Sequence, residues 1–161
     1  MLTSDREFNN IKVHTQYSIC EGAIKIDELA SYCKANKVRA IGLADSYNLC
    51  GALEFSEKIS KVGTQPLIGT QINLSVDNLI GKITLYATSE QGYKNLTKLS
   101  SLSYLKKKDS FEPYCEINDL TLNNRDLIIL TGNYNNFFGK LFYKNKTKHF
   151  EKTIESLNFS F

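Results

Sequence analysis

The segment IKVHTQYSICEGA (11–23) carries side chains with metal-binding and acid–base chemistry near the start of the chain. His14 stands at the end of a short apolar run, and Glu21 follows in the next segment. Imidazole and carboxylate groups are common ligands of catalytic metal ions and common general acids and bases. The segment is therefore compatible with a working site, with the remains of one, or with a strand end that happens to carry a histidine.

Polar residues also stand at the C-terminal ends of three later apolar runs. In parallel α/β folds, catalytic and binding groups lie at the carboxyl ends of the strands. We expect four groups to meet there: Lys12 and His14; Asp45, Ser46 and Asn48; Gly69, Thr70 and Gln71; and Thr131, Gly132 and Asn133. A hydrolytic metal centre needs several His, Asp or Glu ligands. Only His14, Asp45 and Glu21 qualify, which is a weak basis for a stable metal cluster.

Other catalytic patterns are absent from the sequence. There is no P-loop, no GxGxxG and no GxSxG. Cys20 lies near His14, but no orienting carboxylate or amide can be assigned to the pair, so a Cys–His nucleophile is not expected. His149 belongs to the basic stretch KNKTKHFEK, which predicts a solvated helix face.

The composition is that of an ordinary globular domain. The chain has 161 residues, of which 42% are hydrophobic and 23% charged. A formal net charge of +3 is too small to indicate nucleic-acid binding, and the basic run 106–108 predicts a solvated helix end. The four cysteines form no CxxC pair, so we expect buried reduced thiols. With neither a membrane-length apolar run nor a signal peptide, a cytosolic protein is predicted.

Short apolar runs alternate with segments of helical period. The sequence predicts strands at 10–15, 40–45, 66–74, 82–88 and 126–132, and helices at 25–37, 51–63, 89–107, 135–145 and 148–159. The first helix places Ile26, Leu29, Ala30 and Cys33 on one face. This alternation indicates an α/β fold, with helices covering a parallel sheet or the outside of a barrel. About five strands are too few for a complete barrel.

Three segments in order, IKVHTQYSICEGAIKIDEL, AIGLADSYNLCGALEFSEK and QPLIGTQINL, resemble the PHP (polymerase and histidinol phosphatase) domain. The resemblance is to the version at the N-terminus of bacterial DNA polymerase III alpha subunits, and it continues through EQGYKNLTKLSSLSYL and DLIILTGNYNNFFGKLF. It implies a partial, TIM-like (β/α)7 barrel, truncated after about five strands. Residues 1–161 would then be the N-terminal portion of one PHP domain, with no second domain in the chain.

The resemblance also implies where a metal site would lie. Active PHP proteins bind up to three metal ions and hydrolyse phosphoesters. Their His-x-His motif falls on Lys12 and His14, their acidic residue on Glu21, their Asp-His on Asp45–Ser46, their third-strand Glu on Gln71, and their Gly-Cys on Gly132–Asn133. Four ligands are thus replaced by Lys12, Ser46, Gln71 and Asn133, and an ammonium at position 12 would repel cations. We expect a vestigial site with no catalytic residue and no bound cofactor.

The function implied is that of an inactive scaffold in a replicative DNA polymerase of the bacterial cytoplasm. Its expected partners are the rest of the alpha subunit and the proofreading exonuclease (epsilon) subunit. DNA and Mg²⁺ would be bound by other domains of the parent protein, and no membrane is involved. The alternatives are an active metal-dependent phosphoesterase or 3′–5′ exonuclease, and an unrelated α/β binding protein. In the inactive version, His14 could share a polar cluster with Lys12, Glu21 or Asp45, which would replace the charge of the missing cations.

Overall fold

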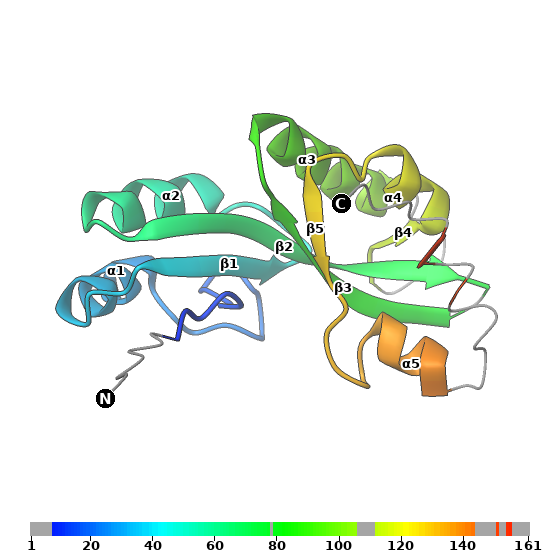
Figure 1. The fold of residues 1–161 in the computed structure, drawn as a ribbon, viewed down its shortest axis with the longest axis horizontal. Coiled ribbons are helices and arrows are strands. Elements are labelled where there is room, and N and C mark those ends of the chain that lie inside the picture. Colours follow the sequence, from blue (N-terminus) through cyan, green and yellow to red (C-terminus); the bar gives the residue numbers. More distant parts are fainter. Residues whose placement is uncertain (1–7, 78, 106–111, 144–150, 152–153, 156–161) are drawn as a thin grey trace, which may run out of the picture.

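The structure is a computed structural model that describes residues 8–77, 79–105, 112–143, 151 and 154–155. Figure 1 shows its elements, which follow the predicted alternation of strands and helices. They are α1 (Ile26–Ala35), β1 (Ala40–Ser46), α2 (Ala52–Lys61), β2 (Gln65–Val76), β3 (Leu79–Ala87), α3 (Glu90–Leu105), β4 (Tyr114–Glu116), α4 (Ile117–Leu122), β5 (Leu127–Leu130) and α5 (Phe137–Tyr143). The short elements β4 and α4 were not predicted. Most of the predicted last helix (148–159) lies outside the described residues.

The strands form one open sheet in the order β1-β2-β3-β5, and β4 pairs with β2 near the C-terminal end of that strand. The fold is therefore mixed α/β with five strands, consistent with the predicted partial barrel. The expectation of a parallel sheet is correct for β1–β2 and β2–β4 but wrong for β3, which runs antiparallel to both β2 and β5. Only two residues separate β2 from β3, and so short a connection joins antiparallel strands. Asp77 begins this turn with φ +46°, the left-handed backbone that hairpin turns favour.

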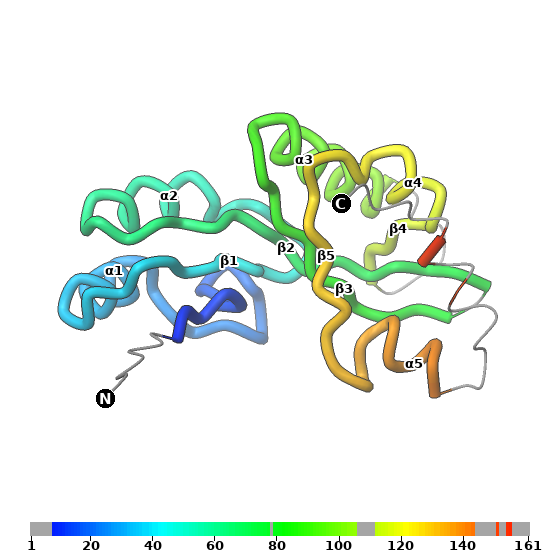
Figure 2. The backbone as a smooth tube through the Cα atoms, viewed as in Figure 1, coloured from blue at the N-terminus to red at the C-terminus, as the bar shows by residue number. Residues whose placement is uncertain are grey.

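The predicted first strand (10–15) is reduced to two isolated parallel bridges, Val13 with Leu43 and Thr15 with Ile24. The segment still lies against β1, as Figure 2 shows, because the Gly42 amide donates to the Asn10 carbonyl at 3.0 Å and the Val13 amide donates to the Gly42 carbonyl at 2.9 Å. A Cβ atom on Gly42 would lie 2.0 Å from the Ile11 carbonyl oxygen. A glycine is therefore what allows this close approach of the two backbones.

Two clusters of buried hydrophobic side chains pack the helices against the sheet. One packs α1 and α2 on β1, and it includes the predicted apolar face of α1, all of it buried. The other surrounds β2 and β3 and takes side chains from α3 and α5. Leu53 of α2 is 72% exposed, whereas Phe55 and Ile59 of the same helix are buried. All four cysteines are free, but Cys20 and Cys50 are exposed rather than buried.

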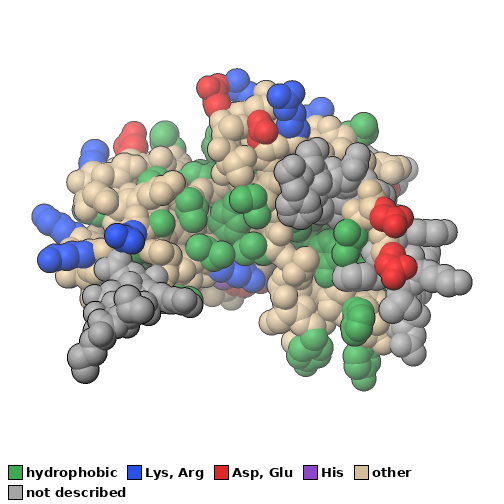
Figure 3. All heavy atoms as spheres, viewed as in Figure 1, with side chains coloured by type: hydrophobic (Ala, Val, Ile, Leu, Met, Phe, Trp, Pro, Cys, Tyr) green, Lys and Arg blue, Asp and Glu red, His purple; other side chains and the backbone are tan. Residues whose placement is uncertain are grey.

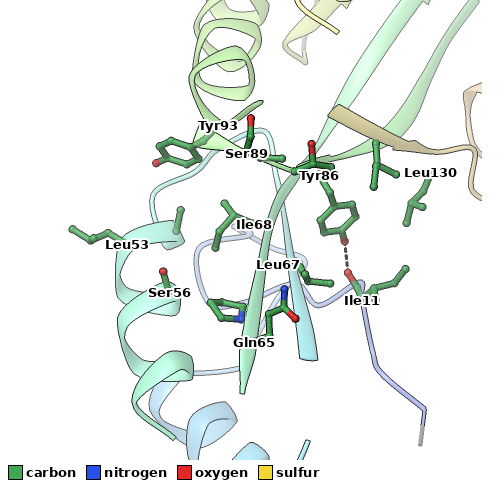
Figure 4. A pocket seen from close by; sticks show the side chains of 15 residues that line it. Ile11, Leu53, Ser56, Gln65, Leu67, Ile68, Tyr86, Ser89, Tyr93 and Leu130 are labelled. Carbon is green, nitrogen blue, oxygen red and sulfur yellow. Dashed lines mark hydrogen bonds between the residues drawn. The ribbon is translucent and has the colours of Figure 1, made fainter. Parts of the chain in front are cut away.

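The exposed Leu53 lines an open groove of about 650 Å³. The groove lies between α2, the start of β2, the end of β3 and β5, and Figure 3 shows hydrophobic side chains gathered on this face. In Figure 4, Leu53, Ile68 and Tyr93 line one part of it and Tyr86 and Leu130 another. None of its lining side chains carries a charge. Acid–base or metal chemistry is therefore not a property of this groove, which is lined by the first residues of β2, whereas Gln71 stands in the middle of that strand.

Candidate functional site

Asp45, at the end of β1, is completely buried. Its carboxylate accepts hydrogen bonds from the Thr15 amide at 2.6 Å, the Thr15 hydroxyl at 2.7 Å and the Ser18 hydroxyl at 2.7 Å. Thr15 and Ser18 are also fully buried. Neutral donors therefore stabilise this carboxylate, and in doing so they fasten the loop after Val13 to the carboxyl end of β1.

Glu21 carries the second carboxylate of the site. Its Oε1 lies 2.5 Å from the Lys82 ammonium, and its Oε2 accepts a hydrogen bond from the Ser46 hydroxyl. These two interactions, with Lys82 contributing more than Ser46, hold the pKa of Glu21 below its usual range. The side chains of Lys82 and Glu21 are 30% and 38% exposed, so the ion pair is only partly open to water.

Lys82 comes from β3, and sequence reasoning did not select it. Its ammonium also lies 5.4 Å from the centre of the Tyr47 ring, within the range of a cation–π interaction. The Tyr47 hydroxyl in turn donates to Glu112 at 2.9 Å, and burial raises the pKa of Tyr47. A sequence signal for Lys82 did exist, because Lys82 and Thr84 alternate with the buried Ile83 and Leu85 and so share the polar face of β3.

Gln71, from β2, completes the polar cluster. It is 4% exposed, and its side-chain nitrogen lies 3.5 Å from the Ser46 hydroxyl oxygen. Its carbonyl oxygen Oε1 is buried and has no hydrogen-bond partner in the described part of the chain. Gln71 stands where the resemblance places a metal-binding Glu. It presents there a neutral acceptor that has no partner among the described residues.

His14 and Lys12 lie at the same polar mouth, the region formed by Glu21, Asp45, Ser46 and Gln71 at the carboxyl end of β1. Their side chains make fewer contacts than that of Glu21. The Nδ1 atom of His14 is 3.4 Å from the Ser18 hydroxyl, and burial, followed by the nearby charge of Lys12, lowers the pKa of the imidazole. Burial and then Lys82 lower the pKa of Lys12. The hydrogen-bonding contact of the His14 ring is therefore with Ser18, whereas Lys12, Glu21 and Asp45 act on it through their charges, and the ammonium that pairs with Glu21 is that of Lys82.

Asn133, the last predicted position, lies in the exposed loop between β5 and α5. Its side-chain oxygen accepts a hydrogen bond from the Asn135 amide at 3.0 Å, and its carbonyl accepts one from the Asn136 amide. These contacts organise its own loop. The structure therefore brings together Lys12, His14, Glu21, Asp45, Ser46 and Gln71, while the contacts of Asn133 lie elsewhere.

The residues at this mouth do not fit a metal ion. Lys82 and Ser46 occupy the two oxygens of Glu21, and Thr15 and Ser18 occupy those of Asp45. Among the described residues, no group of three or more His, Cys, Asp or Glu side chains is placed to hold a metal. An ammonium paired with the exposed carboxylate adds direct repulsion of any cation. We therefore derive no chemical step through a metal at this site.

A half-open α/β barrel with a polar mouth at the carboxyl end of β1 is the class of domain that these features define. Residues 10–161 match the model of the PHP domain, and the chain belongs to that family. A DNA polymerase III subunit alpha from Rickettsia felis is 38% identical over 125 residues, which cover 77% of this chain and 10% of that relative. The corresponding subunit from Caulobacter vibrioides is 36% identical over 150 residues, covering 87% of this chain and 13% of the relative.

The chain thus spans only 10% and 13% of the length of these two curated relatives. Among solved structures, one assigned as a metal-dependent phosphoesterase from Bifidobacterium adolescentis matches 95% of this chain and 56% of its own, with a TM-score of 0.45 and 13% identity. No helix that the structure describes is both long and apolar enough to cross a membrane.

Proposed function

We propose that this chain is a non-catalytic PHP module of a bacterial DNA polymerase III alpha subunit. The likeness to alpha subunits over 77% and 87% of the chain supports this parent. The parent would be a cytoplasmic DNA-directed DNA polymerase that takes part in DNA replication. Polymerisation, DNA binding and the Mg²⁺ that it requires would belong to other parts of that longer protein.

One observation carries the non-catalytic part of the proposal. The carboxylate that an active PHP protein would offer to a cation is Glu21, and here it is paired with Lys82 and Ser46. Hydroxide formation at neutral pH by this family's chemistry depends on bound metal ions. Without a fitting ligand set, the module would stabilise the polymerase fold and provide a surface for the proofreading exonuclease subunit.

The rival function is an active metal-dependent phosphoesterase or 3′–5′ exonuclease. It would require a metal ion to displace Lys82 from Glu21 and to recruit His14. The lowered pKa of His14 leaves its imidazole neutral and able to bind a metal, which is the one feature that favours this rival. The buried hydrogen bonds of Asp45 and the replacement of further ligands by Ser46 and Gln71 oppose it.

Hydrolysis assays distinguish the two functions. The purified chain is incubated with a phosphomonoester and with a 3′-labelled DNA strand, each in the presence of Mn²⁺ or Zn²⁺, beside an active PHP phosphoesterase. We expect no hydrolysis above the protein-free rate. Hydrolysis that disappears in Glu21→Gln would establish the rival function. Co-elution of the full-length parent with a proofreading exonuclease subunit tests docking separately, and loss of docking on removing residues 1–161 is the expected result.

A further inference from the structure

The ion pair between Glu21 and Lys82 is a central difference between this mouth and the metal site of its family. Glu21 comes from the loop before α1, whereas Lys82 comes from β3, 61 residues later in the chain. The Lys82 ammonium lies 2.5 Å from Glu21 Oε1 and above the ring of Tyr47. A lysine held by a carboxylate on one side and an aromatic face on the other is kept at a defined position.

The carboxylate that binds this ammonium belongs to a small group of oxygen acceptors. Glu21 and Gln71 both contact the Ser46 hydroxyl, and the buried Gln71 Oε1 has no hydrogen-bond partner in the part of the chain that the structure describes. A carboxylate, a carbonyl oxygen and a hydroxyl are the oxygen ligands that hard divalent cations use in proteins. The cluster therefore has oxygen atoms of the type that bind cations, but its carboxylate is already paired with the Lys82 ammonium.

We propose that the Lys82 ammonium is the resident cation of this site and that it excludes divalent metal ions. This inference rests on the proposed non-catalytic function and adds the residue responsible. Lys82 is a positioning residue: it neutralises Glu21 and ties the loop before α1 to β3. Lys12 lies at the same mouth, but its ammonium does not form the ion pair with Glu21, so its removal leaves the exclusion in place.

Titration with Mn²⁺, followed by electron paramagnetic resonance and by thermal unfolding, tests the proposal on the complete polypeptide. We compare the wild type with Lys82→Met, Lys82→Arg, Lys12→Met and the exposed-pair control Lys94→Met. Lys94 forms a similar ion pair with Glu90 at 2.7 Å on the surface of α3. Lys82→Met should bind Mn²⁺ at least about tenfold more tightly than the wild type, because a repelling charge is gone. Adding Glu21→Gln to Lys82→Met should abolish the gain.

The three remaining lysine variants should bind Mn²⁺ as weakly as the wild type. Equal affinity in Lys82→Met and the wild type would overturn the proposal, as would an equal gain in Lys12→Met. If Lys82→Met does not fold in metal-free buffer, recovery of its thermal transition by Mn²⁺ supports the proposal, and failure to recover overturns it. Tight Mn²⁺ binding together with hydrolysis by the wild type would instead refute the proposed function itself.

Discussion

Removing the Asp45 carboxylate should cost the fold more than removing any surface carboxylate. Asp45 is fully buried and accepts three hydrogen bonds, from the Thr15 amide, the Thr15 hydroxyl and the Ser18 hydroxyl. Hydrogen bonds to a charged group each contribute about 1.5–3 kcal/mol, so the gross loss in Asp45→Ala is about 5–9 kcal/mol. Release of a buried charge offsets part of this loss. We therefore expect the free energy of unfolding to fall by about 3–5 kcal/mol.

Urea unfolding of the full chain at pH 7 measures this effect, provided that the m-value is unchanged. Asp45→Asn preserves the volume and one acceptor oxygen, so it should lose about half as much as Asp45→Ala. Asp27→Ala is the matched control, because the Asp27 side chain is 76% exposed and forms a surface ion pair with Lys58, and it should leave stability unchanged within error. A loss below about 1 kcal/mol in Asp45→Ala would show that the carboxylate does not fasten the first loop to β1.

Three further results are expected. Gly42→Ala should destabilise the fold by about 1–3 kcal/mol in urea unfolding, because its Cβ would lie 2.0 Å from the Ile11 carbonyl oxygen; an unchanged midpoint would contradict the close approach. Because the pKa of Glu21 is lowered in the folded protein, its carboxylate stabilises the fold above the unfolded value of 4.5. The difference in the free energy of unfolding between the wild type and Glu21→Gln should therefore be largest at pH 7 and disappear as the pH falls through the folded pKa. A difference that does not change with pH would contradict the ion pair. The His14 ring should titrate below 6.5 in NMR, with His149→Gln assigning the signal; a value above 6.5 would contradict the effect of burial.

Local patterns predicted most of the elements because each has a clear period and clear ends. The buried face of α1 was visible from the spacing of Ile26, Leu29, Ala30 and Cys33, and all four are buried. The strand at Ala40–Ser46 is a nearly continuous buried run, and it was found with almost the same bounds. Direction in the sheet was not visible in the same way. The direction of β3 depends on the two-residue connection that begins at Asp77. A pattern of apolar residues does not record the effect of such a short connection.

The site was predicted as a set of positions but not as a set of contacts. Strand ends placed His14, Asp45, Ser46 and Gln71 at one mouth, and the structure brings them together. The alternation in β3 places Lys82 on a polar face, but its pairing with Glu21 could not be assigned from the sequence, because the two residues are 61 positions apart and the antiparallel direction of β3 was not foreseen. Lys12 was selected instead because it stands at the first position of the family's His-x-His motif, which says little about which ammonium reaches a carboxylate.

The vestigial character of the metal site is the central claim, and elemental analysis of the purified protein tests it most directly. The complete polypeptide is expressed in medium supplemented with Zn²⁺ and Mn²⁺, desalted without chelator, and analysed for metal per chain beside Glu21→Gln and His14→Gln. We expect far less than one metal ion per chain, with no difference among the three proteins. Near-stoichiometric zinc or manganese in the wild type, lost in Glu21→Gln or His14→Gln, would contradict the account.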